Sequence, residues 1–200
     1  MHIETVMMHA TPTHGSEVPA LTFMEQGHQW LRLAFWLTGD PGATIDAVTE
    51  VADGHDAAHP FFQEWMTVWA RKLVIAKALG KVHPQMAASI HRTKLRSAEI
   101  SLQWDSLPPP AWSAGHEVGS AHLENALLAI DLFPRCTLLL LVFEKLALDD
   151  VASLLNADKE LVKEAEEIAL TELARNIALE QGWTPMPVPN ASWMGRIQHA

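Results

Sequence analysis

Residues 148–177 read "LDDVASLLNADKELVKEAEEIALTELARNI", and this stretch decides the fold. On each side of a polar break at residues 156–158, apolar side chains recur three or four positions apart, which predicts two helices packed along one face. Asp149 and Asp150 fall in the first turn of the first helix, where negative charge suits the helix dipole. Asp158 is placed to be the N-cap of the second helix. The layout is that of a helix-turn-helix unit.

The second helix of this unit combines an apolar face that favours packing with a polar face that DNA should repel. Helices that read DNA present cations to phosphates and donors to base edges, whereas glutamates dominate the polar face here. The face that would contact DNA in such a unit, which we call the recognition position, consists of Lys159, Glu160, Lys163, Glu164 and Glu167. The apolar stripe consists of Leu161, Ala165, Ile168 or Ala169, Leu173 and Ile177. The glutamates have two interpretations, a solvated helix face or a surface for a basic protein partner.

Helical periodicity extends through most of the remaining chain. Apolar spacing predicts helices at about residues 21–37, 42–51 and 61–79, with a Gly- and Pro-containing break between the first two. Residues 121–181 predict four helices, and Pro134 divides the first pair because proline interrupts a helix but tolerates its first turn. No segment shows the alternation of a strand, so we expect an all-α protein.

The segment between these helical regions differs in composition. Residues 83–120 contain a short helix-compatible piece near residues 87–102 and then "SLPPPAW", which favours an extended, stiff connector. We therefore expect two small helical domains joined by a Pro-rich linker. The predicted boundaries are a flexible leader at 1–20, a helical domain at 21–82, the linker at 83–120, the helix-turn-helix domain at 121–181 and a Pro-rich tail at 182–200.

Composition places the chain among globular, cytoplasmic proteins. Of its 200 residues 48% are hydrophobic, which is enough to form a sizeable core. The longest apolar run, "CTLLLLVF" at residues 136–143, is far shorter than the roughly 18 residues that would cross a membrane. The first twenty residues lack Lys and Arg, so they do not have the pattern of a signal peptide. The single cysteine, Cys136, lies in the apolar run and is expected in the core.

The net charge of −10 is unevenly distributed, and one segment is entirely basic. Seven cations and no carboxylate lie between residues 71 and 96, and we call these cations the cationic band: Arg71, Lys72, Lys77, Lys81, Arg92, Lys94 and Arg96. Trp65 and Trp69 lie just before them, and cations beside aromatic rings suit single-stranded nucleic acid. Alternatively, the cations form an ordinary solubilising face. The tryptophans, which follow the apolar period, are alternatively core residues.

Three stretches, taken in order, resemble a known family. "LRLAFWLTGDPGATIDAVTEV" and "HPFFQEWMTVWARKLVIAKAL" look like the second region of extracytoplasmic-function sigma factors, the bacterial promoter-recognition subunits of RNA polymerase. Residues 124–177, with an acidic pair before "VA" in "DDVASLL", are similar to the fourth region of that family. The Pro-rich segment between them also agrees. The resemblance covers about residues 21–81 and 121–181.

This resemblance implies a division of roles among the residues. It assigns polymerase contact to Asp46, Thr49 and Glu50 and nucleic-acid contact to the cationic band. Thr49 stands where a glutamine is common, and the connection after this patch is shorter than usual. The last helix has only Lys159, Lys163 and Arg175 where the family presents several cations among few acids, which implies weakened promoter recognition.

Two functional hypotheses follow, and neither is enzymatic. The first is a sigma-factor-like transcription protein that binds core RNA polymerase, with promoter DNA as a weakened second partner. The alternative is a sigma mimic that occupies an anti-sigma factor and does not need DNA, and a decayed paralogue is the third. His55 and His59 have a spacing that could suit zinc, but flanking Gly54 and Pro60 favour a loop. We expect no metal, no cofactor and no membrane partner.

Overall fold

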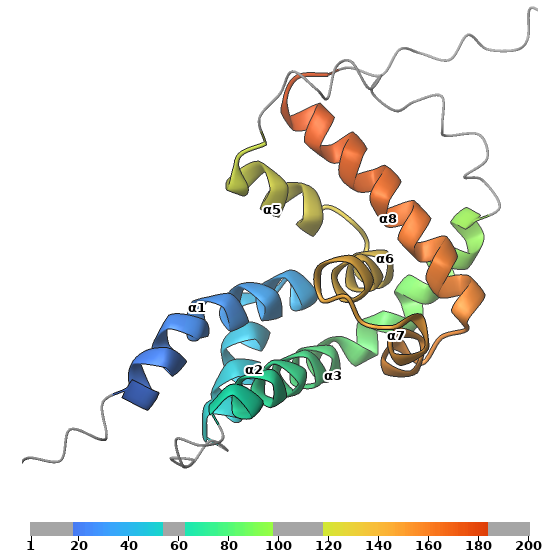
Figure 1. Ribbon diagram of the computed structural model, residues 1–200. Helices are drawn as coiled ribbons and strands as arrows, with labels where there is room; N and C mark the ends of the chain where they lie inside the picture. Colours follow the sequence, from blue (N-terminus) through green and yellow to red (C-terminus); the bar gives the residue numbers. More distant parts are fainter. Residues whose placement is uncertain (1–17, 54–62, 98–117, 184–200) are drawn as a thin grey trace, which may run out of the picture.

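The protein is described by a computed structural model at residues 18–53, 63–97 and 118–183, and every regular element in these ranges is helical (Figure 1). The elements are α1 (Val18–Thr38), α2 (Pro41–Asp53), α3 (Gln63–Ser97), α5 (Ser120–Leu128), α6 (Leu132–Leu138), the π-helical turn η4 (Leu139–Phe143), α7 (Leu148–Leu155) and α8 (Lys159–Glu180). The all-α prediction is confirmed. We call α1–α3 the N-terminal half and α5–α8 the C-terminal half.

The turn between α1 and α2 shows why the chain reverses where it does. Gly39 adopts a φ of 69°, which suits a residue without a Cβ, and it ends α1. The side chain of Asp40 then accepts a hydrogen bond from the backbone N–H of Ala43 at 2.7 Å, which caps α2. Leu37 and Ala47 are fully buried, one on each helix beside this turn. The two helices therefore pack their apolar faces against each other and against α3.

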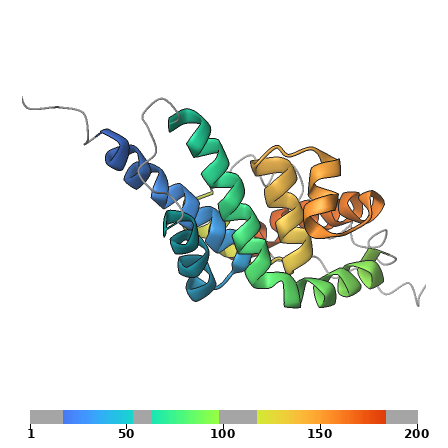
Figure 2. The same cartoon turned by 90° about the horizontal axis from the view of Figure 1, so that it is seen from below.

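Helix α3 extends well beyond the predicted helix at residues 61–79. It passes through Pro84 to Ser97, so residues 83–97 of the predicted linker are helical. A proline inside a helix removes one backbone hydrogen bond and bends the axis, and Figure 2 shows α3 changing direction along its length. Beyond the proline, Met86, Ser89 and Thr93 are buried at helical spacing, so packing keeps the helix intact. The "SLPPPAW" segment lies outside the described residues.

The C-terminal half contains the four predicted helices. Pro134 lies in the first turn of α6, and Asp131 caps this helix by accepting a hydrogen bond from the N–H of Leu132 at 2.9 Å. Asn156 ends α7 in the left-handed conformation, and Asp158 occupies the N-cap position of α8 as predicted. The α8 stripe packs inward, with Leu161, Ala165, Ile168 and Ala169 buried and Leu173 and Ile177 half-buried.

The two halves share one hydrophobic core. Helix α6 lies between the N-terminal half and α8 (Figure 1), and its Phe133 is fully buried. The backbone N–H of Phe133 donates to Ser89 Oγ on α3 at 2.8 Å, and Cys136 Sγ lies 3.6 Å from the carbonyl oxygen of Leu37 on α1. Cys136 is a core residue, as predicted. The sequence had suggested two domains held by a linker, whereas these contacts join the halves directly.

Candidate functional site

The predicted polymerase-contact residues lie together on the exposed side of α2. Asp46, Thr49 and Glu50 are all exposed, but the carboxylate of Glu50 is engaged by α3. Lys81 Nζ lies 2.6 Å and Lys77 Nζ 2.9 Å from its oxygens, and Lys81 is also 3.9 Å from Asp46. Hydrogen bonds from Lys81 and Lys77 lower the pKa of Glu50 to about 2. Residues predicted to contact the polymerase and cations predicted to contact nucleic acid therefore form one ion-pair cluster.

Arg71 of the cationic band reaches into the C-terminal half. Its guanidinium forms a two-point contact with Glu144, with Nη2 2.7 Å from Oε1, and this hydrogen bonding raises the pKa of Arg71. The Glu144 side chain is only 5% exposed, whereas that of Arg71 is 44% exposed. The carboxylate of Glu144 is thus buried, and the half-exposed guanidinium of Arg71 lies between it and the solvent.

Arg92 and Arg96 also pair with carboxylates of the C-terminal half further along α3. Arg92 binds Asp131 through two hydrogen bonds of 2.7 and 2.9 Å, and Arg96 pairs with Glu172 on α8. Burial alone would raise the pKa of Asp131, but hydrogen bonds from Arg92 and from the N–H of Leu132 together hold it below its ordinary value. Asp131 therefore caps α6 and anchors α3 with the same carboxylate.

Five of the seven cations in the cationic band thus have carboxylate partners on other elements. Lys72 and Lys94 are exposed and pair with no carboxylate among the described residues. The structure places the seven side chains on the single helix α3, whereas the sequence predicted a helix only at about residues 61–79 and put Arg92, Lys94 and Arg96 in the linker. It also commits most of their charge to contacts within the chain.

The tryptophans near the band divide into two cases. Trp69 is 39% exposed, and the side chain of Trp65 lies outside the described residues. An aromatic cluster that sequence analysis missed lies nearby, where Trp36 Nε1 donates to Glu124 at 3.1 Å and the ring meets Phe143 edge-on at 6.2 Å. Arg32 lies 5.9 Å from the same ring. Trp36 therefore joins α1 to both α5 and the end of η4.

The face of α8 at the recognition position is exposed and mainly acidic. Lys159 pairs with Asp149 on α7 at 2.6 Å, and this contact raises the pKa of Lys159. Glu160, Lys163 and Glu167 are exposed, as is Glu164. The charge of Lys159 is therefore balanced by a carboxylate of α7. The ion pair makes the net charge of this face more negative than the two lysines suggest.

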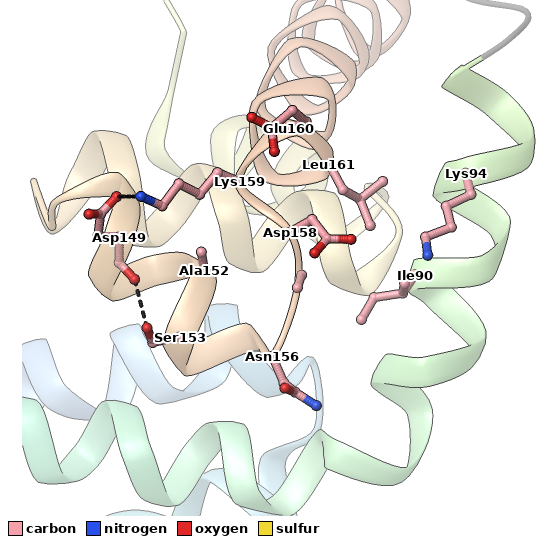
Figure 3. A pocket seen from close by; sticks show the side chains of 11 residues that line it. Ile90, Lys94, Asp149, Ala152, Ser153, Asn156, Asp158, Lys159, Glu160 and Leu161 are labelled. Atoms are coloured by element: carbon pink, nitrogen blue, oxygen red, sulfur yellow. Dashed lines mark hydrogen bonds and ion pairs between the residues drawn. The ribbon is translucent and has the colours of Figure 1, made fainter.

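A groove of about 660 Å³ separates the end of α3 from the turn between α7 and α8 (Figure 3). Ile90 and Lys94 line the side formed by α3, and Asp158 and Lys159 lie across from them. Asp158 makes no side-chain hydrogen bond to the first turn of α8, although it occupies the N-cap position. The groove thus contains charges of both signs.

Arg135 is a buried cation that sequence analysis did not single out. It is 6% exposed, and its Nη1 donates to the carbonyl oxygens of Leu128 and Ile130 at 3.0 and 3.3 Å. Burial lowers its pKa. A Cβ at Gly39 would lie 3.0 Å from its Nη2, so the α1–α2 turn packs directly on this side chain. A lone Arg between Pro and Cys carries no signal that marks it as buried.

Within the described ranges, no helix is long and apolar enough to cross a membrane. Nor do three or more His, Cys, Asp or Glu side chains there gather closely enough to bind a metal ion. His55 and His59 lie outside those ranges. Comparison of the chain with protein-family models, with curated proteins and with solved structures finds no match.

Proposed function

We propose that the protein is a sigma-factor-like regulator of transcription initiation that binds core RNA polymerase and recognises promoter DNA only weakly by itself. The proposal rests on the resemblance of three ordered stretches of sequence to the second and fourth regions of that family. Its weakened DNA recognition is supported by one observation, the carboxylate-rich exposed face of α8. A helix that packs correctly yet presents Glu160, Glu164 and Glu167 at the recognition position would repel phosphates.

The charge state of α3 supports the same conclusion. Phosphate contacts require cations that can leave their present partners, and Arg71, Arg92 and Arg96 are held by carboxylates. Lys72 and Lys94 are the cations best placed to contact nucleic acid directly. In this proposal, polymerase contact through Asp46 and Thr49 supplies most of the affinity, and DNA contact adds to it.

The first test is binding of the purified protein to bacterial core RNA polymerase over a salt series, with and without promoter DNA. The proposal predicts saturable binding to core that promoter DNA strengthens. Asp46→Ala combined with Thr49→Ala should weaken core binding, whereas Asp150→Ala, which removes an exposed carboxylate from α7, should not. Absence of binding to core would refute the proposal.

A second candidate is a sigma mimic that binds an anti-sigma factor and does not contact DNA. The pairing of five cations within the chain favours it, because a protein partner does not require free arginines. Lys72→Glu combined with Lys94→Glu separates the candidates with little damage to internal contacts. If these lysines bind single-stranded DNA, the slope of log K against log salt should become shallower by about 1.4. A pure mimic should lack DNA binding before and after the change.

Lys163→Glu is the matched control for the lysine variants. It reverses an exposed lysine on α8, a helix that the proposal excludes from strong DNA contact. Its effect on the salt slope should be smaller than that of either Lys72→Glu or Lys94→Glu. An equal effect would show that DNA binding is a general charge effect.

A further inference from the structure

We propose that three ion pairs between α3 and the C-terminal half form an autoinhibitory contact, which holds the arginines of the cationic band on carboxylates of the same chain and away from nucleic acid. The inference rests on the proposed function, because it concerns regulation of the same cations. The pairs are Arg71–Glu144, Arg92–Asp131 and Arg96–Glu172.

The geometry of the pairs resembles that of arginine on phosphate. Arg71 and Arg92 each make two hydrogen bonds to one carboxylate, which is the arrangement that arginine also uses with phosphate oxygens. The same donors cannot serve both acceptors. Nucleic acid must therefore displace Glu144 and Asp131 before it can use these arginines, and this competition lowers its apparent affinity.

The exposed fractions of the side chains differ between the two members of each pair, with the carboxylate less exposed than the arginine. Side chains of the three carboxylates are 5%, 23% and 19% exposed, whereas those of their arginines are 44%, 54% and 40% exposed. The carboxylates belong to three separate places in the C-terminal half, namely the end of η4, the cap of α6 and the middle of α8. The contact therefore runs along α3 and depends on how the halves are docked.

A shift between docked and undocked halves would change all three arginines together. A partner that binds the C-terminal half only when it is free of α3 would release them, because a ligand shifts a conformational equilibrium by its differential affinity for the two states. Lys72 and Lys94 would stay accessible in both states. The docked protein thus retains weak contact with nucleic acid, and the undocked protein gains three more phosphate contacts.

The test replaces the three carboxylates in one variant, Glu144→Gln, Asp131→Asn and Glu172→Gln, and measures binding to a labelled oligothymidine over a salt series. Freeing three arginines should make the slope of log K against log salt steeper by about 2 and tighten binding by about tenfold or more at low salt. The matched control, Asp150→Asn, Asp158→Asn and Glu180→Gln, makes the same change in net charge at exposed carboxylates that do not touch the arginines. Its slope should stay at the wild-type value.

Equal slopes for the two variants would overturn the autoinhibitory contact. Circular dichroism melting establishes that each variant is folded, and the single change Glu172→Gln replaces the triple variant if that one does not fold. The single variant should steepen the slope by about 0.7, and an unchanged slope there would also overturn the contact.

Binding to core RNA polymerase, measured on the same proteins, separates this inference from the proposed function. A gain in DNA binding without any binding to core would refute the proposed function and leave the contact established. Binding to core without a gain in DNA binding would refute the contact alone.

Discussion

The Arg71–Glu144 pair should contribute more to stability than any pair on the surface, because only one of its members is in water. Replacing Arg71 with Met leaves a carboxylate that is 5% exposed without its guanidinium partner. Breaking a fully buried pair costs about 3–5 kcal/mol, and an exposed pair contributes about 0.2–1 kcal/mol. Since the arginine is 44% exposed, we expect Arg71→Met to cost about 2 kcal/mol, between these limits.

A double-mutant cycle isolates the pair from other effects of each substitution. Urea unfolding of wild type, Arg71→Met, Glu144→Gln and the double variant should give a coupling free energy of about 1.5 kcal/mol, as expected for a charge-assisted, two-point contact that is partly open to water. Lys159–Asp149 is the control cycle, because at 2.6 Å its contact is equally close but its side chains are 51% and 71% exposed. Its coupling should be about 0.5 kcal/mol. Equal coupling in the two cycles would refute the argument from burial.

Three further predictions concern backbone conformation and the buried thiol. Gly39→Ala should destabilise the protein by about 1–2 kcal/mol in urea unfolding, because the φ of Gly39 is 69°. Gly80→Ala should stabilise it by about 0.5–1 kcal/mol, because Gly80 lies in α3 and no atom lies near the added Cβ. Asn156→Ala should cost about 1 kcal/mol and Asn156→Gly much less, since the residue is left-handed at the end of α7. Burial raises the pKa of Cys136 to about 12, so a maleimide should label it only through unfolding, and stability should fall as pH rises through the ordinary thiol pKa towards 12. Labelling of the native protein at the rate of a free thiol would contradict this.

Local patterns predicted the positions of most helices, because these depend on neighbours in the sequence. The apolar stripe of α8, the cap position of Asp158 and the burial of Cys136 all follow from spacing or composition. The continuation of α3 past Pro84 does not follow from local patterns, since it depends on buried contacts of Ser89 and neighbouring residues with the C-terminal half. Proline reduces local helix propensity, and tertiary packing overcame it.

The missed parts of the candidate site are long-range pairings. Arg71 and Glu144 are 73 positions apart, and Arg92 and Asp131 are 39 apart. Periodicity reports which face of a helix is apolar, but it does not report which carboxylate a cation on the opposite face will meet. The seven basic residues therefore looked free in the sequence.

The core shared through Phe133 ties the energetics of the two halves together. Loss of either half would expose apolar surface that the other half now covers, so thermal unfolding should occur as one cooperative transition. A ligand for one half would then also protect the other from unfolding, since binding to the native state alone stabilises the whole cooperative unit. Hydrogen exchange in α2 would therefore slow when a partner binds α8 of the docked protein, although the two helices need not share any atom of that partner.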